Sequence, residues 1–244
     1  MRRIIFNIVF LFYSLTGYNQ ISGIVNTYAS VSKIFASVRT DVDSVIINDN
    51  HGFKGGDTVI IIQMQGARDS LINKTENTII GYGSCGNFEF IIINNIIDSL
   101  VIFKSPFIKS YIDTDKVQLV KVANYINATI TLNDTLQAGS WDGSMGGVLA
   151  IAVMDTLQIN GIMNAAGKGF RSAPATRSDK IKCGENNYAY FKENYSADAF
   201  DTAGLKGEGI KKADSSIIRG RGNVMNGGGG GCGFNSGGGG GGRH

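Results

Sequence analysis

Residues 227–242 read GGGGGCGFNSGGGGGG, and this stretch sets how the rest of the chain is interpreted. Glycine has no side chain to bury, and it loses more backbone entropy on ordering than other residues. Such a tract cannot build an ordinary core. It either stays poorly ordered and spans distance, or it packs against backbone where only a hydrogen atom fits. The sequence therefore predicts a glycine-rich tail, residues 227–244, that is poorly ordered or of polyglycine type.

The segment before this tract, residues 171–226, is polar and has little periodicity. Tyr188, Tyr190, Phe191 and Tyr195 form an aromatic group within it. We interpret the segment as a polar surface insertion held by these rings. The alternative is a carbohydrate-binding module, because aromatic faces pack against the C–H groups of sugars.

Further towards the N-terminus, residues 126–170 contain short apolar runs separated by Gly or Asn. The expected strands are 128–132, 148–153, 156–159 and a last one that begins at 162, with a tight turn at Asn160–Gly161. Short strands bounded by glycine are typical of the stacked turns of a β-solenoid. An extension of the preceding sheet, as in a sandwich, is the alternative.

Residues 21–125 are rich in Val, Ile, Phe and Tyr, with alternation over short runs and turn residues between them. The expected strands are 44–47, 58–64, 78–81, 87–93, 99–104 and 116–122, with a turn at Asn94–Asn95. Strands at this spacing predict a small β-barrel or sandwich. The fold class expected for the whole chain is therefore all-β.

The N-terminus, residues 1–20, has the pattern of a signal peptide. Arg2 and Arg3 precede an apolar run at 4–15, which is too short to cross a bilayer of about 30 Å. Cleavage near Gly17 or Gln20 fits the polar residues that follow; an N-terminal anchor or a buried strand is the alternative. We expect a secreted protein, located at the cell surface or extracellular, with no transmembrane helix in the mature chain.

Composition excludes several kinds of function. The chain has 23 basic and 20 acidic residues, and without Arg2 and Arg3 the two signs nearly balance, so nucleic acid is not an expected partner. Only two histidines occur, His51 and His244, which removes most zinc sites and Ser-His-Asp triads. The sequence assigns no catalytic, cofactor-binding or metal-binding residues.

Other motifs have structural interpretations. Residues 81–86 match G-x-G-x-x-G, but a strand former follows instead of the helix that a dinucleotide site needs, so a glycine-rich turn is expected. Asp41 with Asp43, and Asp113 with Asp115, have the spacing of paired carboxylates on one face of a strand.

Trp141, the single tryptophan, is expected to fill the junction between the two strand-rich blocks. Cys85, Cys183 and Cys232 are far apart, and their spacing does not indicate any disulfide pairing.

The order of these segments resembles the N-terminal region of large glycine-rich secreted surface proteins of gliding-type bacteria, which are often exported by the type IX route. The matching segments are 53–67, 116–125, 141–143 with 146–148, 157–171, 206–210 and 220–222, followed by the glycine tract. The resemblance implies export and a role in adhesion or motility, and it assigns no active site. Such proteins end in repeats and a sorting domain, so the resemblance also implies an N-terminal fragment of a longer chain.

We therefore expect a non-catalytic cell-surface protein with an adhesive or structural role, whose partners are extracellular polysaccharide or other surface components. The first alternative is a carbohydrate-active β-helix enzyme, a lyase or hydrolase, for which the solenoid segment offers Asp134, Asp142, Asp155 and Lys168. The second is the carbohydrate-binding module formed by Tyr188, Tyr190 and Tyr195. No pattern in the sequence indicates an oligomeric state.

Overall fold

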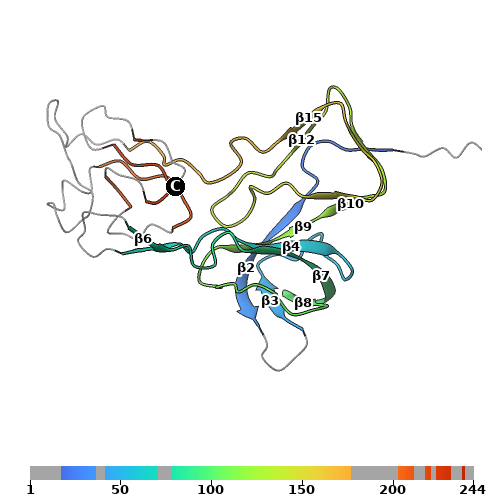
Figure 1. Cartoon of the computed structure of the whole chain (residues 1–244), viewed down its shortest axis with the longest axis horizontal. Helices are drawn as coiled ribbons and strands as arrows, with labels where there is room; N and C mark the ends of the chain where they lie inside the picture. The colour runs from blue at the N-terminus through green and yellow to red at the C-terminus, as the bar shows by residue number, and fades with distance from the viewer. Residues whose placement is uncertain are drawn as a thin grey trace, which may run out of the picture.

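The computed structural model describes residues 18–36, 42–70, 78–176, 203–211, 218–220, 224–231 and 238–239, and no helix occurs among them. Figure 1 shows two groups of strands, one below the other, with the glycine-rich C-terminal segments beside them and close to β6. The all-β prediction is confirmed.

Six strands form a closed barrel in the order β2-β3-β8-β7-β4-β9. Their bounds are β2 Thr27–Phe35, β3 Ser44–Ile47, β4 Thr58–Gln63, β7 Phe88–Ile97, β8 Leu100–Phe103 and β9 Val117–Lys121. Every neighbouring pair is antiparallel, and the pairing of β2 with β9 closes the ring. Of the two alternatives, barrel and sandwich, the barrel is therefore the correct one.

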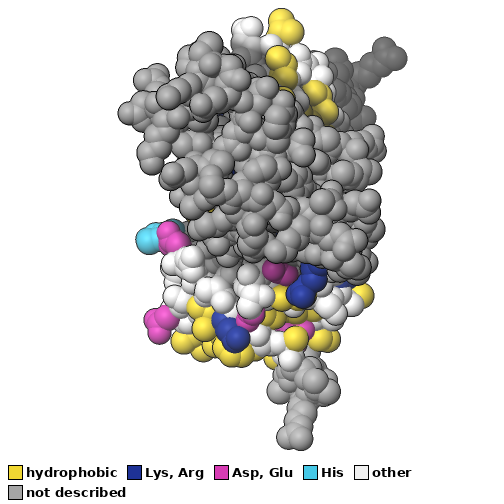
Figure 2. All heavy atoms as spheres, turned by 90° about the vertical axis from the view of Figure 1, so that its left-hand side faces the viewer, with side chains coloured by type: hydrophobic (Ala, Val, Ile, Leu, Met, Phe, Trp, Pro, Cys, Tyr) yellow, Lys and Arg dark blue, Asp and Glu magenta, His cyan; other side chains and the backbone are white. Residues whose placement is uncertain are grey.

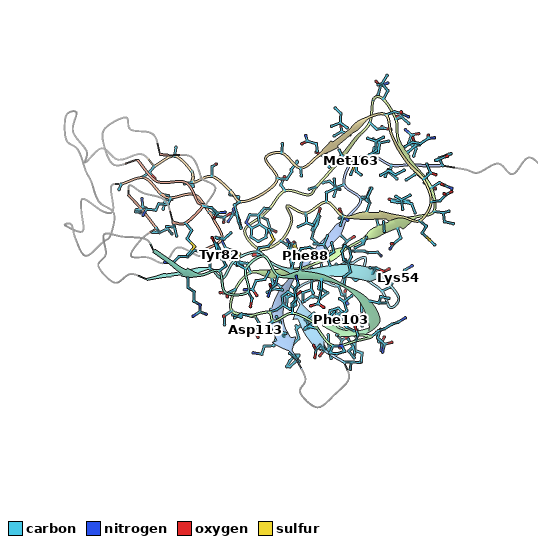
Figure 3. All side chains as sticks on the ribbon, viewed as in Figure 1. Lys54, Tyr82, Phe88, Phe103, Asp113 and Met163 are labelled. Atoms are coloured by element: carbon cyan, nitrogen blue, oxygen red, sulfur yellow. The ribbon has the colours of Figure 1, made fainter. Side chains whose placement is uncertain are left out.

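Alternating side chains fill the barrel. In β3, Val45 and Ile47 are buried, while Ser44 and Ile46 are half-buried. Phe103 is completely buried inside the ring of strands, as Figure 3 shows. Phe107 and Tyr111, from the loop after β8, continue from Phe103 with ring centroids 5.3 and 5.4 Å apart. The barrel thus has a packed interior, closed at one end by an aromatic loop.

Strand β7 is longer than the sequence predicts. The turn expected at Asn94–Asn95 is instead a β-bulge, because the register of β7 against β8 shifts between Ile93 and Asn95. The chain reverses at Asp98, which has a φ of 53°. The apolar residues beyond the two asparagines still pair with β8, so the strand continues where polar residues indicate a turn.

Above the barrel lies a β-solenoid (Figure 1). Its first turn consists of β10 Ala123–Tyr125, β11 Ala128–Ile130 and β12 Thr135–Gln137. Its second turn consists of β13 Ile151–Val153, β14 Leu157–Ile159 and β15 Ile162–Asn164. Each strand pairs in parallel with its counterpart one turn away, which confirms the solenoid and excludes an extension of the antiparallel sheet.

The barrel is inserted into this solenoid. Strand β1, Asn19–Gln20, pairs in parallel with β11, and Gly23 bridges to Leu136 of β12. Residues 19–23 thus form part of a solenoid turn that stacks on the first turn. The chain then forms the whole barrel and returns to the solenoid at Ala123. The strand-rich block expected at residues 21–125 therefore starts and ends with solenoid residues, 21–23 and 123–125.

A two-stranded ribbon extends from the barrel. Strand β5, Arg68–Ser70, pairs with β6, Thr78–Gly81. Just before β5, the amides of Gly66 and Ala67 both donate to the carbonyl oxygen of Ile210. The base of this ribbon therefore holds the first described C-terminal segment, residues 203–211, near its end.

Candidate functional site

The outer face of β7 exposes three large apolar side chains in a row. Phe88, Phe90 and Ile92 are 48%, 60% and 41% exposed, whereas Ile91 and Ile93 between and beyond them are buried in the barrel. Alternation along the strand places the first three on one face, on a backbone held by the barrel. We call these three residues the β7 stripe. An exposed apolar row of this kind is more informative than a scattered exposed leucine.

The solenoid covers the barrel surface beside the β7 stripe. Ile60 and Ile62 of β4 pair directly opposite Phe90 and Phe88. Ile60 is only 7% exposed, since it packs in a cluster with Val120, Val122 and Ala150, and Ile62 packs against the same cluster. The stripe is therefore the uncovered continuation of the apolar surface on which the solenoid sits.

Two lysines flank the β7 stripe. Lys109 Nζ lies 4.9 Å from the centroid of the Phe88 ring. At the other end of the stripe, Lys104 comes directly after strand β8. Its amide donates to the Ile92 carbonyl, and its side chain is exposed. Hydrophobic side chains gather over the barrel in the space-filling view, with basic and acidic groups among them (Figure 2).

Glu89 fixes the loop that carries Lys109. Its carboxylate accepts hydrogen bonds from the amides of Ile108 and Lys109 and from the Tyr111 hydroxyl. Burial, together with the hydrogen bond and charge of Glu89, raises the pKa of Tyr111. The carboxylate of Glu89, between the two exposed phenylalanines, thus binds the loop after β8. This loop holds Lys109 over the β7 stripe.

Side-chain amides join the barrel to the solenoid. Gln118 Nε2 donates to the Gly146 carbonyl at 2.9 Å, and Gln118 Oε1 accepts from the Gly146 amide at 2.7 Å. Asn26 makes the same two-way contact with Ala150, at 2.6 and 3.0 Å. Each amide pairs with backbone as a neighbouring strand would. The two bodies are therefore held by directional hydrogen bonds as well as by apolar packing.

Tyr28 adds a third contact at this junction. Its hydroxyl donates to the Val148 carbonyl and accepts from the Gly139 amide. A Cβ on Gly139 would lie 2.7 Å from the Tyr28 ring, so the junction needs glycine at that position.

Glutamines at the end of β4 hold distant segments. Gln63 is fully buried; its Nε2 donates to Asp115 and its Oε1 accepts from the Ile112 amide. Gln65 Nε2 donates to the Gly209 carbonyl at 2.7 Å. Residues 63–67 thus attach both the aromatic loop and the C-terminal region to the barrel.

The described glycine-rich segments form one unit held by their backbone. We call residues 203–211, 218–220 and 224–231 the glycine unit. Its hydrogen bonds join Gly204 N to Gly231 O, Gly207 N to Gly228 O, Gly220 N to Gly204 O and Gly230 N to Gly220 O, at 2.8 to 2.9 Å. A Cβ on Gly230 would collide with the carbonyl oxygen of Gly204. For residues 227–231, the part of the predicted tail that lies in this unit, the bonds fit the polyglycine alternative.

The glycine unit crosses the boundary that the sequence suggests between a polar insertion at 171–226 and a tail at 227–244. Ala203, Val224 and Met225 are buried, which a solvated surface insertion does not require. The described parts of both predicted segments form one hydrogen-bonded body.

Trp141 connects the solenoid to the glycine unit. It is 3% exposed, its ring packs edge-on against Phe170, and its Nε1 donates to Glu208 at 3.0 Å. Arg171 forms an ion pair with the same carboxylate. Burial alone raises the pKa of Glu208, but the hydrogen bonds and charge of Arg171 and the bond from Trp141 outweigh it, so the pKa lies below its ordinary value. The sequence predicts Trp141 at the junction between the two strand-rich blocks, whereas these contacts place it between the solenoid and the glycine unit.

The paired carboxylates of the sequence analysis have separate structural partners. Asp43 is buried and accepts from the Phe107 amide, whereas Asp41 lies outside the described residues. Asp113 forms an ion pair with Lys33, which lowers its pKa. Asp115 accepts from Gln63.

The four solenoid residues considered for catalysis are likewise held locally. Asp134 accepts from Thr131 and Gln20, and these bonds lower its pKa. Asp142 caps its own turn by accepting from the amides of Ser144 and Met145. The remaining two contacts join Asp155 to Thr156 and Lys168 to Ser140. These described bonds do not bring the four residues together.

The remaining motifs follow their structural interpretations. Residues 81–86 form a turn between β6 and β7, and His51 is exposed in a turn beside Asp49. Cys85 is a free thiol whose pKa burial raises to about 11, with the Asp115 charge adding to the shift. Tyr188, Tyr190, Phe191, Tyr195, Cys183 and Cys232 lie outside the described residues.

In the part of the chain that the structure describes, three or more His, Cys, Asp or Glu side chains are nowhere grouped as a metal site would need. The same residues include no helix of a length and hydropathy that could cross a membrane.

Sequence reasoning missed the β7 stripe, although its signal is present. Residues 88–93 read FEFIII, and a closed barrel must turn every second one of these side chains outwards. The sequence does not show which of the outward faces the solenoid covers.

No family model and no curated protein matches the chain. Two solved structures that are similar in part are phage tailspikes. The Gp54 tailspike of Acinetobacter baumannii bacteriophage AP22, solved in complex with A. baumannii capsular saccharide, has a TM-score of 0.30 and 14% identity, over 56% of this chain and 22% of that chain. The tailspike protein gp49 from Pseudomonas phage LKA1 has a TM-score of 0.27 and 15% identity, over 60% and 21%. The match spans only about a fifth of each tailspike, and at these scores it carries no argument about function.

Proposed function

We propose that the chain is a secreted, non-catalytic cell-surface protein with an adhesive role, and that its β7 stripe binds an anionic extracellular polysaccharide. The observation that supports this most directly is the row of exposed Phe88, Phe90 and Ile92 between two lysines. Aromatic faces attract the polarised C–H groups of a sugar ring. Lysines beside them supply charge for carboxylate, sulfate or phosphate groups.

The geometry suits a chain-like ligand better than a small one. The stripe follows a strand, and side chains on one face of a strand are about 6.6 Å apart. The surface is an open row on the outside of a barrel whose interior is filled. A polymer lying along β7 can contact both rings and both lysines at once, which makes many weak contacts act together.

Binding by the purified chain to a carboxylated polysaccharide, alginate, tests the proposal, with uncharged dextran for comparison. Phe90→Ala removes the most exposed ring of the stripe without opening the core, and we expect alginate affinity to fall about tenfold. Phe35→Ala is the matched control, since Phe35 is 46% exposed on the barrel but lies outside the stripe. It should bind as the unchanged chain does.

The lysines give a second, independent readout. Replacing Lys104 and Lys109 with Gln should weaken binding to alginate and flatten its dependence on salt concentration. Equal binding by the Phe90 and Phe35 variants, or no binding of either polymer by the unchanged chain, would contradict the proposal.

A further inference from the structure

The two turns of the solenoid bury their interior to very different degrees. Ile130 and Leu136 of the first turn are completely buried. Their parallel partners in the second turn, Ile159 and Met163, occupy the same interior positions but are 52% and 40% exposed. Met163 is labelled on the solenoid in Figure 3. The apolar interior of the solenoid therefore continues to its second turn and is open there.

On one side, the backbone of the second turn has no partner strand in the part of the chain that the structure describes. The Thr156 carbonyl and the Asn160 amide point towards the first turn: the first accepts from the Ala128 amide, and the second donates to the Ile130 carbonyl. Peptide groups alternate in direction along a parallel strand, so those of Leu157 and Ile159 point the other way. Among the described strands, none pairs with this side of β13, β14 or β15. We call it the free edge.

The free edge lacks the features that keep strand edges from pairing. Strands β13, β14 and β15 read IAV, LQI and IMN, with no proline and no charged residue. Natural edges are commonly protected by lysine, proline or a bulge. Over residues 151–170 the only charged side chains are Asp155 and Lys168, so two copies of this edge would not repel each other. Figure 2 shows hydrophobic side chains exposed at the solenoid end of the molecule.

We propose that the free edge is an interface at which two copies of this chain pair, second turn against second turn. Each copy presents the same open row of amides and carbonyls and the same apolar interior. A two-fold axis perpendicular to the solenoid brings these edges together in antiparallel register, so that each satisfies the other. The pairing continues the rung-to-rung stacking that already buries Ile130 and Leu136.

A charge placed at the interface tests the proposal, with Ile159→Lys as the variant. Ile159 faces the solenoid interior, so an opposing copy would bury the lysine without a partner. Ile162→Lys is the matched control, because Ile162 is 58% exposed on β15 but its neighbour Met163 takes the interior position. Thermal midpoints and circular dichroism of both variants verify that they fold.

Sedimentation equilibrium of the full chain gives the readout. We expect the unchanged chain and Ile162→Lys to form dimers, and Ile159→Lys to have a dimer dissociation constant raised about 100-fold or more. Monomers in all three cases, or equal association of the two variants, would overturn the proposal.

Hydrogen exchange gives a check that needs no variant. The amides of Leu157 and Ile159 should become protected as the concentration of the unchanged chain rises. Protection at every concentration in a monomeric sample would mean that another segment of the same chain covers the edge, and it would refute pairing between copies.

Discussion

The barrel and the glycine unit hold their chains together in opposite ways. In the barrel, side chains such as Phe103 and Leu119 fill the interior completely, and the hydrogen-bonded strands surround them. In the glycine unit, segments come so close that a Cβ on Gly230 or Gly204 would contact backbone at less than ordinary van der Waals separation. The barrel is stabilised by the side chains that fill its interior. The close approach of segments in the glycine unit requires positions that have no side chain.

This difference separates the mutations that each region tolerates. A barrel is weakened by making a side chain smaller, because a cavity remains. A backbone-packed unit is weakened by making a side chain larger, because nothing nearby can yield except backbone.

Truncation inside the barrel should have the largest effect. Phe103→Ala empties a completely buried ring site and should lower the free energy of unfolding by about 3–5 kcal/mol. Phe35→Ala, on the exposed end of β2, should change it by less than about 0.5 kcal/mol. Urea unfolding followed by far-ultraviolet circular dichroism measures both. Equal losses would show that the barrel interior does not carry the stability.

A change at the junction of barrel and solenoid should have an intermediate effect on stability, because a side-chain amide there forms the hydrogen bonds that a neighbouring strand would form. Gln118→Leu keeps the volume but leaves the Gly146 amide and carbonyl without their partner, and we expect a loss of about 2–4 kcal/mol. Gln158→Leu replaces an exposed glutamine of β14 and serves as the control in the same urea titration. Unchanged stability of the Gln118 variant would mean that apolar packing alone joins the two bodies.

In the glycine unit, adding a single methyl group to a glycine should already lower stability. Gly230→Ala forces a Cβ against the Gly204 carbonyl, and we expect this unit to lose about 1–3 kcal/mol. Gly239→Ala adds the same methyl group where no atom lies within 4 Å, and it should have little effect. Limited proteolysis compares the two variants. Indistinguishable cleavage would argue against close backbone packing at Gly230.

Acidification should weaken the contact between the glycine unit and the solenoid, and it should have the smallest effect on stability of these four changes. The folded pKa of Glu208 lies below its ordinary value, so its ionised form stabilises the folded state above the unfolded pKa. That contribution is lost as the pH falls from about 5 through the folded pKa. Trp141, the single tryptophan, donates to this carboxylate and reports the change by its fluorescence.

We expect the Trp141 emission maximum to move to longer wavelength over that pH range. Glu208→Gln, which cannot ionise, should remove this pH dependence. The same shift in the Glu208 variant would assign the effect to another group.

Local pattern predicted much of the fold, and long-range contacts account for what it missed. Residues 44–47 and 78–81 are strands as predicted, and the solenoid turns follow the glycine-bounded runs. The bulge at Asn94–Asn95 was missed, because polar residues in a strand resemble a turn until the partner strand is known. The pairing of β1 with β11 in the solenoid was also missed, because the whole barrel lies between these two strands in the sequence.

The candidate site depends even more on contacts that are distant in sequence. Alternation in residues 88–93 identifies two faces of a strand, but either face can be covered. Only the placement of the solenoid on β4 and β9 leaves the outer face of β7 exposed. The same applies to Gln118 and Asn26, whose partners Gly146 and Ala150 carry no side-chain chemistry that a sequence could signal.

Hydrogen exchange of glycine amides tests the central claim most directly, namely that backbone pairing replaces side-chain packing in the C-terminal region. The amides of Gly204, Gly207, Gly220 and Gly230 donate to carbonyls of other segments. We expect them to exchange at least about 100-fold more slowly than in an unstructured peptide, as strand amides of the barrel do. Exchange of these four amides at the unstructured rate, with the barrel still protected, would contradict the account.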